Sequence, residues 1–186
     1  MTRPDSAVSA TSYTRPARYL HWLLAVMLFG MFVLGFYMEG LPLSPNKLKL
    51  YSWHKWAGVT IFMLVIIRLA WRVTHRPPPL AHTMPPLMKF AAHAGHAALY
   101  GLMLVIPLSG WLMSSAMGIQ TVWFGVVPLP DLIPKSKELG DFLQATHGNL
   151  NLLFIATLVG HIGMALKHHF VDKDGTLYRM LPKTEN

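Results

Sequence analysis

The sequence predicts an all-α protein of the integral membrane class, folded as an antiparallel four-helix bundle. Of the 186 residues, 53% are hydrophobic and only 13% are charged, about half the charged fraction of an ordinary soluble domain. Four apolar stretches are each long enough to cross a bilayer as a helix, which takes about 20 residues. The charged residues gather at the ends of these stretches. We therefore expect membrane lipid to be the main solvent around the fold.

The four predicted helices span residues 17–38, 53–74, 88–117 and 141–170, inside one transmembrane domain over residues 15–171. The first stretch is longer than the core of a signal peptide and is expected to be a retained transmembrane helix. Turn-forming segments rich in proline or glycine separate the stretches. The ends of the chain, residues 1–14 and 172–186, are predicted to be polar cytoplasmic tails, the first of them flexible.

The basic residues predict the orientation of the helices. If the amino terminus is cytoplasmic, the opposite side holds only five of the 16 lysines and arginines, namely Lys47, Lys49, Lys55, Lys135 and Lys137. Cytoplasmic loops carry the excess of basic residues in membrane proteins. Both termini are therefore expected in the cytoplasm. The same distribution accounts for the net charge of +8 without a nucleic-acid partner, and none is expected.

Ten histidines and no cysteine stand in this apolar chain. The absence of cysteine excludes disulfides, iron–sulfur clusters and covalently attached haem. An ionisable group inside a membrane is energetically expensive and marks a functional site by default. Five histidines of the predicted helices are well placed for such a site: His21, His54, His96, His147 and His161.

The spacing of the histidines predicts two paired sites. His147 and His161 are 14 residues apart, which is about 21 Å along a helix and only about 40° short of four full turns. Both rings therefore leave the same helix face, near opposite sides of the bilayer. With alternating helix directions, His54 reaches the depth of His147 and His21 the depth of His161. His96 also lies at the depth of His161, so the inner pair stays open between His21 and His96.

Two imidazoles at one depth favour haem over a simple metal ion. A catalytic zinc site commonly adds a carboxylate and a structural one usually uses cysteine, but the interiors of the predicted spans hold neither. Haem iron needs only two protein ligands because the porphyrin supplies four nitrogens. We expect two non-covalent b haems. Near the cytoplasmic side, four further residues are expected to contact a haem propionate or a quinone: His96, His168, Arg68 and Arg72.

These histidines and their surroundings resemble the prokaryotic cytochrome b561 family. The resemblance rests on the pair His21-Trp22, on His54, on the segment 91–96 that ends in His96, on His147 with His161, and on the tail segments 167–170 and 174–182. The chain is also similar to the membrane cytochrome b subunits of formate dehydrogenases and hydrogenases. The resemblance implies a diheme four-helix bundle in the bacterial inner membrane, and it favours His21 as the inner haem ligand.

The resemblance also implies a reaction. Like a superoxide oxidase of this family, the chain is expected to oxidise superoxide at the periplasmic face and to reduce ubiquinone. Lys47, Lys49 and Lys55 would steer the anionic radical toward the outer site. Two alternatives remain: an electron-transfer anchor subunit for a dehydrogenase or periplasmic redox protein, and a histidine-lined metal-ion transporter. No nucleophile and base are arranged for hydrolase or transferase chemistry.

Overall fold

The computed structural model describes residues 12–80 and 84–181, so residues 1–11 of the predicted amino-terminal tail and residues 182–186 of the predicted carboxyl-terminal tail lie outside the described residues. Four long helices form the fold: α2 (Arg15–Glu39), α3 (Pro45–Thr74), α4 (Pro86–Ala116) and α5 (Lys137–Lys167). Each is long and apolar enough to cross a membrane. The prediction of an all-α membrane four-helix bundle is confirmed.

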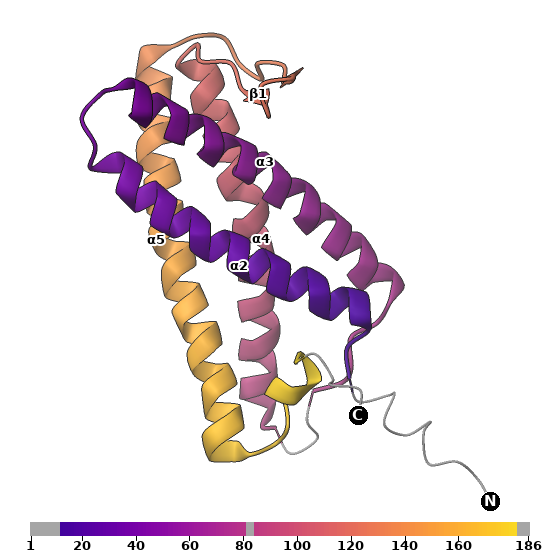
Figure 1. The fold of residues 1–186 in the computed structure, drawn as a ribbon. Helices are drawn as coiled ribbons and strands as arrows, with labels where there is room; N and C mark the ends of the chain where they lie inside the picture. Colours follow the sequence, from indigo (N-terminus) through magenta and orange to yellow (C-terminus); the bar gives the residue numbers. More distant parts are fainter. Residues whose placement is uncertain (1–11, 81–83, 182–186) are drawn as a thin grey trace, which may run out of the picture.

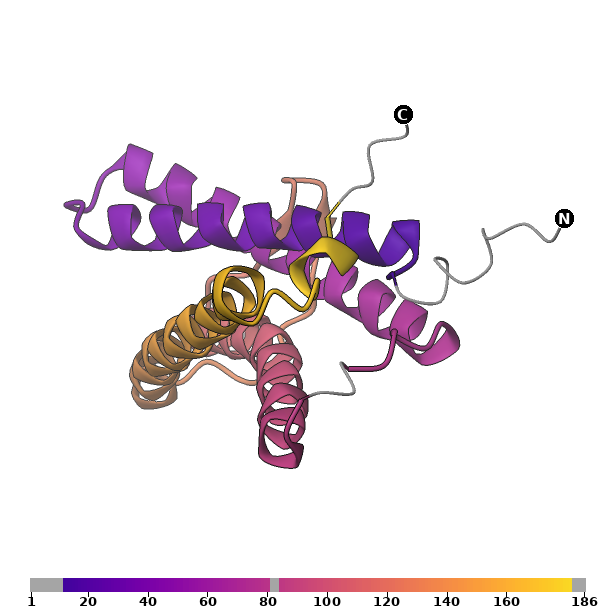
Figure 2. The same cartoon turned by 90° about the horizontal axis from the view of Figure 1, so that it is seen from below.

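The helices are arranged as two antiparallel pairs. α2 packs against α3, α4 packs against α5, and α3 joins the pairs through α4. Figures 1 and 2 show the α2–α3 pair crossing obliquely over the α4–α5 pair. The start of α2 and the end of α5 lie at one end of the bundle, here called the terminal end. The opposite end carries the α2–α3 and α4–α5 connections and is called the loop end.

Local sequence sets where the helices begin and end. α3 begins at Pro45, ahead of the apolar stretch that starts at Trp53, because Ser44 caps it: the Ser44 side chain accepts a hydrogen bond from the backbone N–H of Lys47 at 3.2 Å. Proline suits a first helical turn since its missing N–H would be unpaired there. Ser136 caps α5 in the same way through the N–H of Leu139.

Beyond Lys167, α5 continues as a short π-helix, η1 (His168–Asp172), which ends at Lys173 in the left-handed region with φ +51°. A 3-10 turn, η2 (Leu177–Arg179), follows and returns the chain to the start of α2. The Trp22 indole N–H donates to the Met180 carbonyl at 2.9 Å. The carboxyl-terminal segment therefore lies across the terminal end of the bundle (Figure 1).

The core is small and the outside is apolar. Leu24, Ile61 and Val65 are buried between α2 and α3, and a second cluster around Phe154 lies between α4 and α5. In contrast, Phe29 is 70% exposed in the isolated chain. A helix with apolar side chains on its outer face is suited to lipid, where all backbone polar groups are paired within the helix.

The α4–α5 connection folds back onto α3. It contains two short antiparallel strands, β1 (Val122–Trp123) and β2 (Val127–Pro128). The Trp56 indole N–H donates to the Val122 carbonyl at 2.6 Å, and the Trp123 indole N–H donates to the Thr60 hydroxyl at 3.2 Å. These bonds hold the connection over the loop end of the bundle.

The arrangement of the ends predicts the result of a topology experiment. Because both described ends of the chain lie at the terminal end and the basic residues favour that end for the cytoplasm, fluorescent protein fused after the carboxyl terminus should fluoresce. Alkaline phosphatase inserted after Leu132 in the α4–α5 connection should be active, since this enzyme folds only outside the cytoplasm. Active phosphatase at the carboxyl terminus would reverse the assigned orientation.

Candidate functional site

The structure brings His54 of α3 and His147 of α5 together at the loop end. Their ring centroids are 6.3 Å apart and the ring planes are inclined by 76°. Both rings are half-buried and line a cavity in the bundle core to which all four helices contribute. Its walls are mainly apolar and include Phe32, Phe62 and Phe154. No carboxylate is among the residues that line it.

The ring of His147 is held against α4. Its Nδ1 lies 2.9 Å from the Ser109 hydroxyl oxygen and 3.1 Å from the Ile106 carbonyl oxygen. A carbonyl can only accept, so we assign the proton of the neutral ring to Nδ1, which leaves the lone pair on Nε2. A Cβ on Gly110 would come within 3.2 Å of the same ring. The ring therefore lies close to the Gly110 backbone, where a side chain would have to displace it slightly.

The ring of His54 is held less firmly. Its Nδ1 is buried and has no hydrogen-bond partner in the part of the chain that the structure describes. A Cβ on Gly35 of α2 would lie 3.7 Å from the His54 ring, in ordinary contact. A buried ring nitrogen without a partner is energetically unfavourable. The His54 ring therefore lacks the support at Nδ1 that Ser109 and Ile106 give to the His147 ring.

Three histidines meet at the terminal end. The ring centroid of His161 on α5 lies 6.3 Å from that of His21 on α2, with planes inclined by 72°. The same ring lies 5.6 Å from that of His96 on α4, with planes inclined by 67°. Both His21 and His96, the two predicted partners of His161, therefore lie near its ring, at different centroid separations.

Arginines surround this cluster. The Arg68 guanidinium donates to the Tyr100 hydroxyl at 3.0 Å and to the Ala17 carbonyl at 2.8 Å, and its Nη2 lies 3.5 Å from His21 Nδ1. The Arg72 guanidinium stacks over the Tyr100 ring, 5.6 Å from its centre. Arg18 is buried, donates to the Leu181 carbonyl, and leaves its Nε without a partner among the described residues. This concentration of positive charge suits an anionic group.

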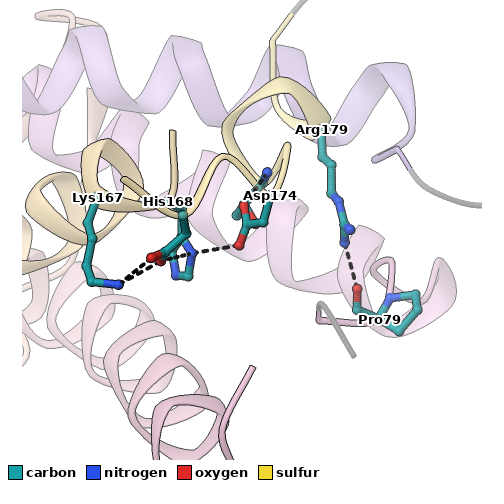
Figure 3. A network of polar contacts seen from close by, with 7 residues as sticks. Pro79, Lys167, His168, Asp174 and Arg179 are labelled. Atoms are coloured by element: carbon teal, nitrogen blue, oxygen red, sulfur yellow. Dashed lines mark hydrogen bonds and ion pairs between the residues drawn. The ribbon is translucent and has the colours of Figure 1, made fainter. Parts of the chain in front are cut away.

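His168 is engaged by carboxylates of the following turn (Figure 3). Its Nδ1 lies 2.7 Å from an Asp174 carboxylate oxygen and 3.1 Å from one of Asp172. Lys167 also pairs with Asp172 at 2.7 Å. Burial raises the pKa of Asp174, but hydrogen bonds from Thr176 and the neighbouring His168 lower it by a larger amount. The net pKa of Asp174 is therefore below its usual value. His168 thus helps to fasten the carboxyl-terminal segment.

The three lysines predicted to steer an anion all lie near the loop end. Lys55 is the one of the three that lines the loop-end cavity, and its ammonium donates to the Ile119 carbonyl at 3.1 Å. The Lys47 ammonium donates to the carbonyls of Glu39 and Leu41. Lys49 lies over the Trp53 ring, 5.1 Å from its centre.

Sequence reasoning missed Ser109, Gly110 and Arg18. A serine next to a glycine inside an apolar stretch is usually interpreted as a helix-packing site. The contact of Ser109 with His147 becomes visible only when α5 is placed against α4. Arg18 precedes His21 by three residues, one turn along the same face. That spacing could have indicated that Arg18 lies near the site of His21. A basic residue at a helix end is, however, usually interpreted as an interfacial anchor.

Comparisons with known proteins agree on one family. A sequence profile described as prokaryotic cytochrome b561 matches residues 12–183. The chain is 39% identical to cytochrome b561 homolog 2 of Escherichia coli K12, over 92% of this chain and 95% of that protein. It is 29% identical to cytochrome b561 homolog 1 of the same organism, over 92% and 97%. It is 31% identical to the probable superoxide oxidase CybB of Yersinia pestis, over 70% and 73%.

The network in Figure 3 predicts how the carboxyl-terminal segment is held. Asp174→Asn removes the charge that faces His168, so trypsin should cleave after Lys173 about threefold faster, in line with the modest energies of partly exposed ion pairs. Asp141→Asn is the matched control because it removes an exposed pair with Lys137 at the other end of α5. Equal cleavage rates in all three proteins would show that Asp174 does not fasten this segment.

Proposed function

This chain belongs to the prokaryotic cytochrome b561 family, and we propose that it is a diheme cytochrome that transfers electrons from periplasmic superoxide to ubiquinone. Membership establishes the broader function, which is electron transfer in a bacterial membrane by a b-type cytochrome. The number of haems, their ligands, the donor and the acceptor are the content of the proposal.

The separation of the paired rings is the observation that carries the proposal. With a metal–nitrogen bond of about 2.0 Å on each side and each ring centre about 1.1 Å behind its nitrogen, two imidazoles facing each other across one metal ion have centres about 6.2 Å apart. The His54–His147 and His21–His161 pairs both have centroid separations of 6.3 Å. We assign these pairs as the residues that would hold the iron of two haems.

The same distance favours His21 over His96. The His96–His161 separation of 5.6 Å is shorter than two opposed ligands require. His96 is therefore left free to donate a hydrogen bond near the site. Together with Arg72 and Tyr100, whose side chains are stacked, it supplies polar groups for a quinone at the terminal end, which we assign to the cytoplasmic side.

The protein sets position, ligation and charge, while bound haem b supplies a one-electron carrier. The His54–His147 pair would hold one haem in the loop-end cavity, whose walls are mainly apolar. At the terminal end, Arg18 and Arg68 are placed to neutralise the carboxylates that haem carries. Arg18 fits this role because its buried Nε lacks a partner among the described residues.

Charge at the loop end supports superoxide as the donor. Lys55 lines the cavity that holds His54 and His147, and Lys47 and Lys49 add positive charge nearby. Such charge raises the encounter rate of an anion. The name of the Yersinia pestis relative points to the same substrate. In the net reaction, two superoxide ions give two molecules of dioxygen and supply two electrons, which with two protons reduce one ubiquinone to ubiquinol.

A second candidate function is an anchor subunit that receives electrons from a partner protein. It is favoured by the apolar tip of the α4–α5 connection, where Phe124 is 57% and Val126 78% exposed. Such a tip is suited to contact another protein or the membrane interface. Because the family transfers electrons, a histidine-lined metal-ion transporter is not proposed.

The ligand assignment predicts haem content. His21→Ala, His54→Ala, His147→Ala and His161→Ala should each lower the content from two haems per chain to one, because one axial ligand is lost. His96→Ala should keep two haems. His93→Ala, one turn away on the same helix and exposed, is the control. Haem per chain is measured as the pyridine complex. If His96→Ala held one haem and His21→Ala held two, His96 and not His21 would be the partner of His161 in holding the haem.

The donor assignment predicts a fast reaction with superoxide. In rapid-mixing spectroscopy with catalase present, a superoxide pulse should reduce the haem band and ubiquinone should reverse it. Lys55→Gln should slow the reduction about threefold at low salt and less at high salt, because steering is screened. Lys137→Gln, whose ammonium is paired with Asp141, should match the wild type. Reduction by dithionite but not by superoxide would favour the anchor function.

A further inference from the structure

The two histidines of the loop-end pair have different hydrogen-bonding environments. His147 Nδ1 has two oxygen atoms within 3.1 Å, from Ser109 and Ile106. His54 Nδ1 is buried without a partner in the described chain. Ser109 is itself only 5% exposed, so solvent does not compete for its hydroxyl. The difference between the two rings therefore comes from α4, from one backbone carbonyl and one side chain.

The direction of each hydrogen bond can be assigned. The Ser109 hydroxyl lies 2.7 Å from the Ile106 carbonyl oxygen, which can only accept. The hydroxyl proton therefore points to that carbonyl, and a lone pair of the hydroxyl oxygen faces His147. The Nδ1–H of His147 donates to this lone pair. Ser109 thus acts as an acceptor for His147 while its own proton is used elsewhere.

A hydrogen-bond acceptor behind a ligating imidazole changes what the ring offers to a metal. Donation from Nδ1–H increases the electron density of the ring and the basicity of Nε2. For haem iron, a more basic axial ligand stabilises the ferric state over the ferrous state and lowers the reduction potential. The Gly110 backbone fixes the ring in the place where this bond is short.

We infer that Ser109 is a positioning residue that lowers the reduction potential of the loop-end haem through His147. This inference rests on the proposed function, since it requires His147 to be an axial ligand. At the terminal end, the neighbour of His21 Nδ1 is the cationic Arg68, which has no acceptor to offer. Ser109 therefore favours a potential at the loop end below that at the terminal end, which makes transfer toward the quinone side downhill.

Redox titration of the purified holoprotein tests the inference. In Ser109→Ala the Ile106 carbonyl remains as an acceptor, so both haems should stay bound. The loop-end step of the titration is identified as the one that is missing in His147→Ala. In Ser109→Ala this step should move to higher potential. We expect its reduction equilibrium constant to rise by a factor of about three to ten, where tenfold is about 59 mV for one electron. The terminal-end step should not move. Ser114→Ala is the matched control, a second serine on α4 that is 5% exposed.

The outcomes separate this inference from the proposed function. A Ser109→Ala titration that superimposes on the wild type, with two haems present, overturns the role of Ser109 alone. A shift in Ser114→Ala equal to that in Ser109→Ala also overturns it. If Ser109→Ala loses one haem, Ser109→Thr decides: two haems at wild-type potentials support the hydroxyl as the active group, and the same loss as in alanine contradicts it. Two haems in His147→Ala would instead refute the proposed ligation.

Discussion

The meeting of two imidazoles at each end of the bundle is the constraint on which the proposed haem sites depend. In lipid, backbone polar groups are satisfied only within helices, so each spanning segment presents its histidine at a depth fixed by the sequence. A ring that does not meet a partner at that depth is a polar group in an apolar medium. The antiparallel order of α2, α3 and α5 brings His21 to His161 and His54 to His147, both at 6.3 Å.

The two ends of the bundle have different chemistry because different neighbours surround the pairs. At the terminal end, Arg68 places positive charge beside His21, and the carboxyl-terminal segment contacts Arg18 and Trp22. At the loop end, the pair lines an apolar cavity and His147 rests on Ser109 and Gly110. The terminal end is therefore suited to anionic groups, and the loop end offers two imidazoles in a mainly apolar cavity.

Much of this could be predicted from the sequence because the relevant spacings are helical. The apolar stretches are each long enough to be recognised, and the 14 residues between His147 and His161 place both rings on one face of α5. The depths of His21, His54 and His96 follow from chain direction alone. The choice between His21 and His96 did not follow from depth, since it depends on side-chain separations of 6.3 and 5.6 Å.

Features that follow neither from the length of an apolar stretch nor from helical spacing could not be predicted. The start of α3 at Pro45 depends on a serine cap, and the seat of His147 depends on how closely α4 approaches α5 at Gly110. The contact of His168 with a propionate or quinone stays a prediction, and the structure adds that its ring lies beside Asp172 and Asp174. The contact with these carboxylates arises from the π-helical turn after α5, for which the sequence offers no periodic signal.

Quantitative electron paramagnetic resonance of the oxidised protein tests the central claim most directly. Two strong nitrogen ligands on each iron make ferric haem low-spin, so bis-histidine ligation at both ends predicts two low-spin ferric haems per chain and no high-spin signal. One low-spin haem per chain, or a stoichiometric high-spin signal from an iron with an open position, would contradict the account of two histidine pairs as haem sites.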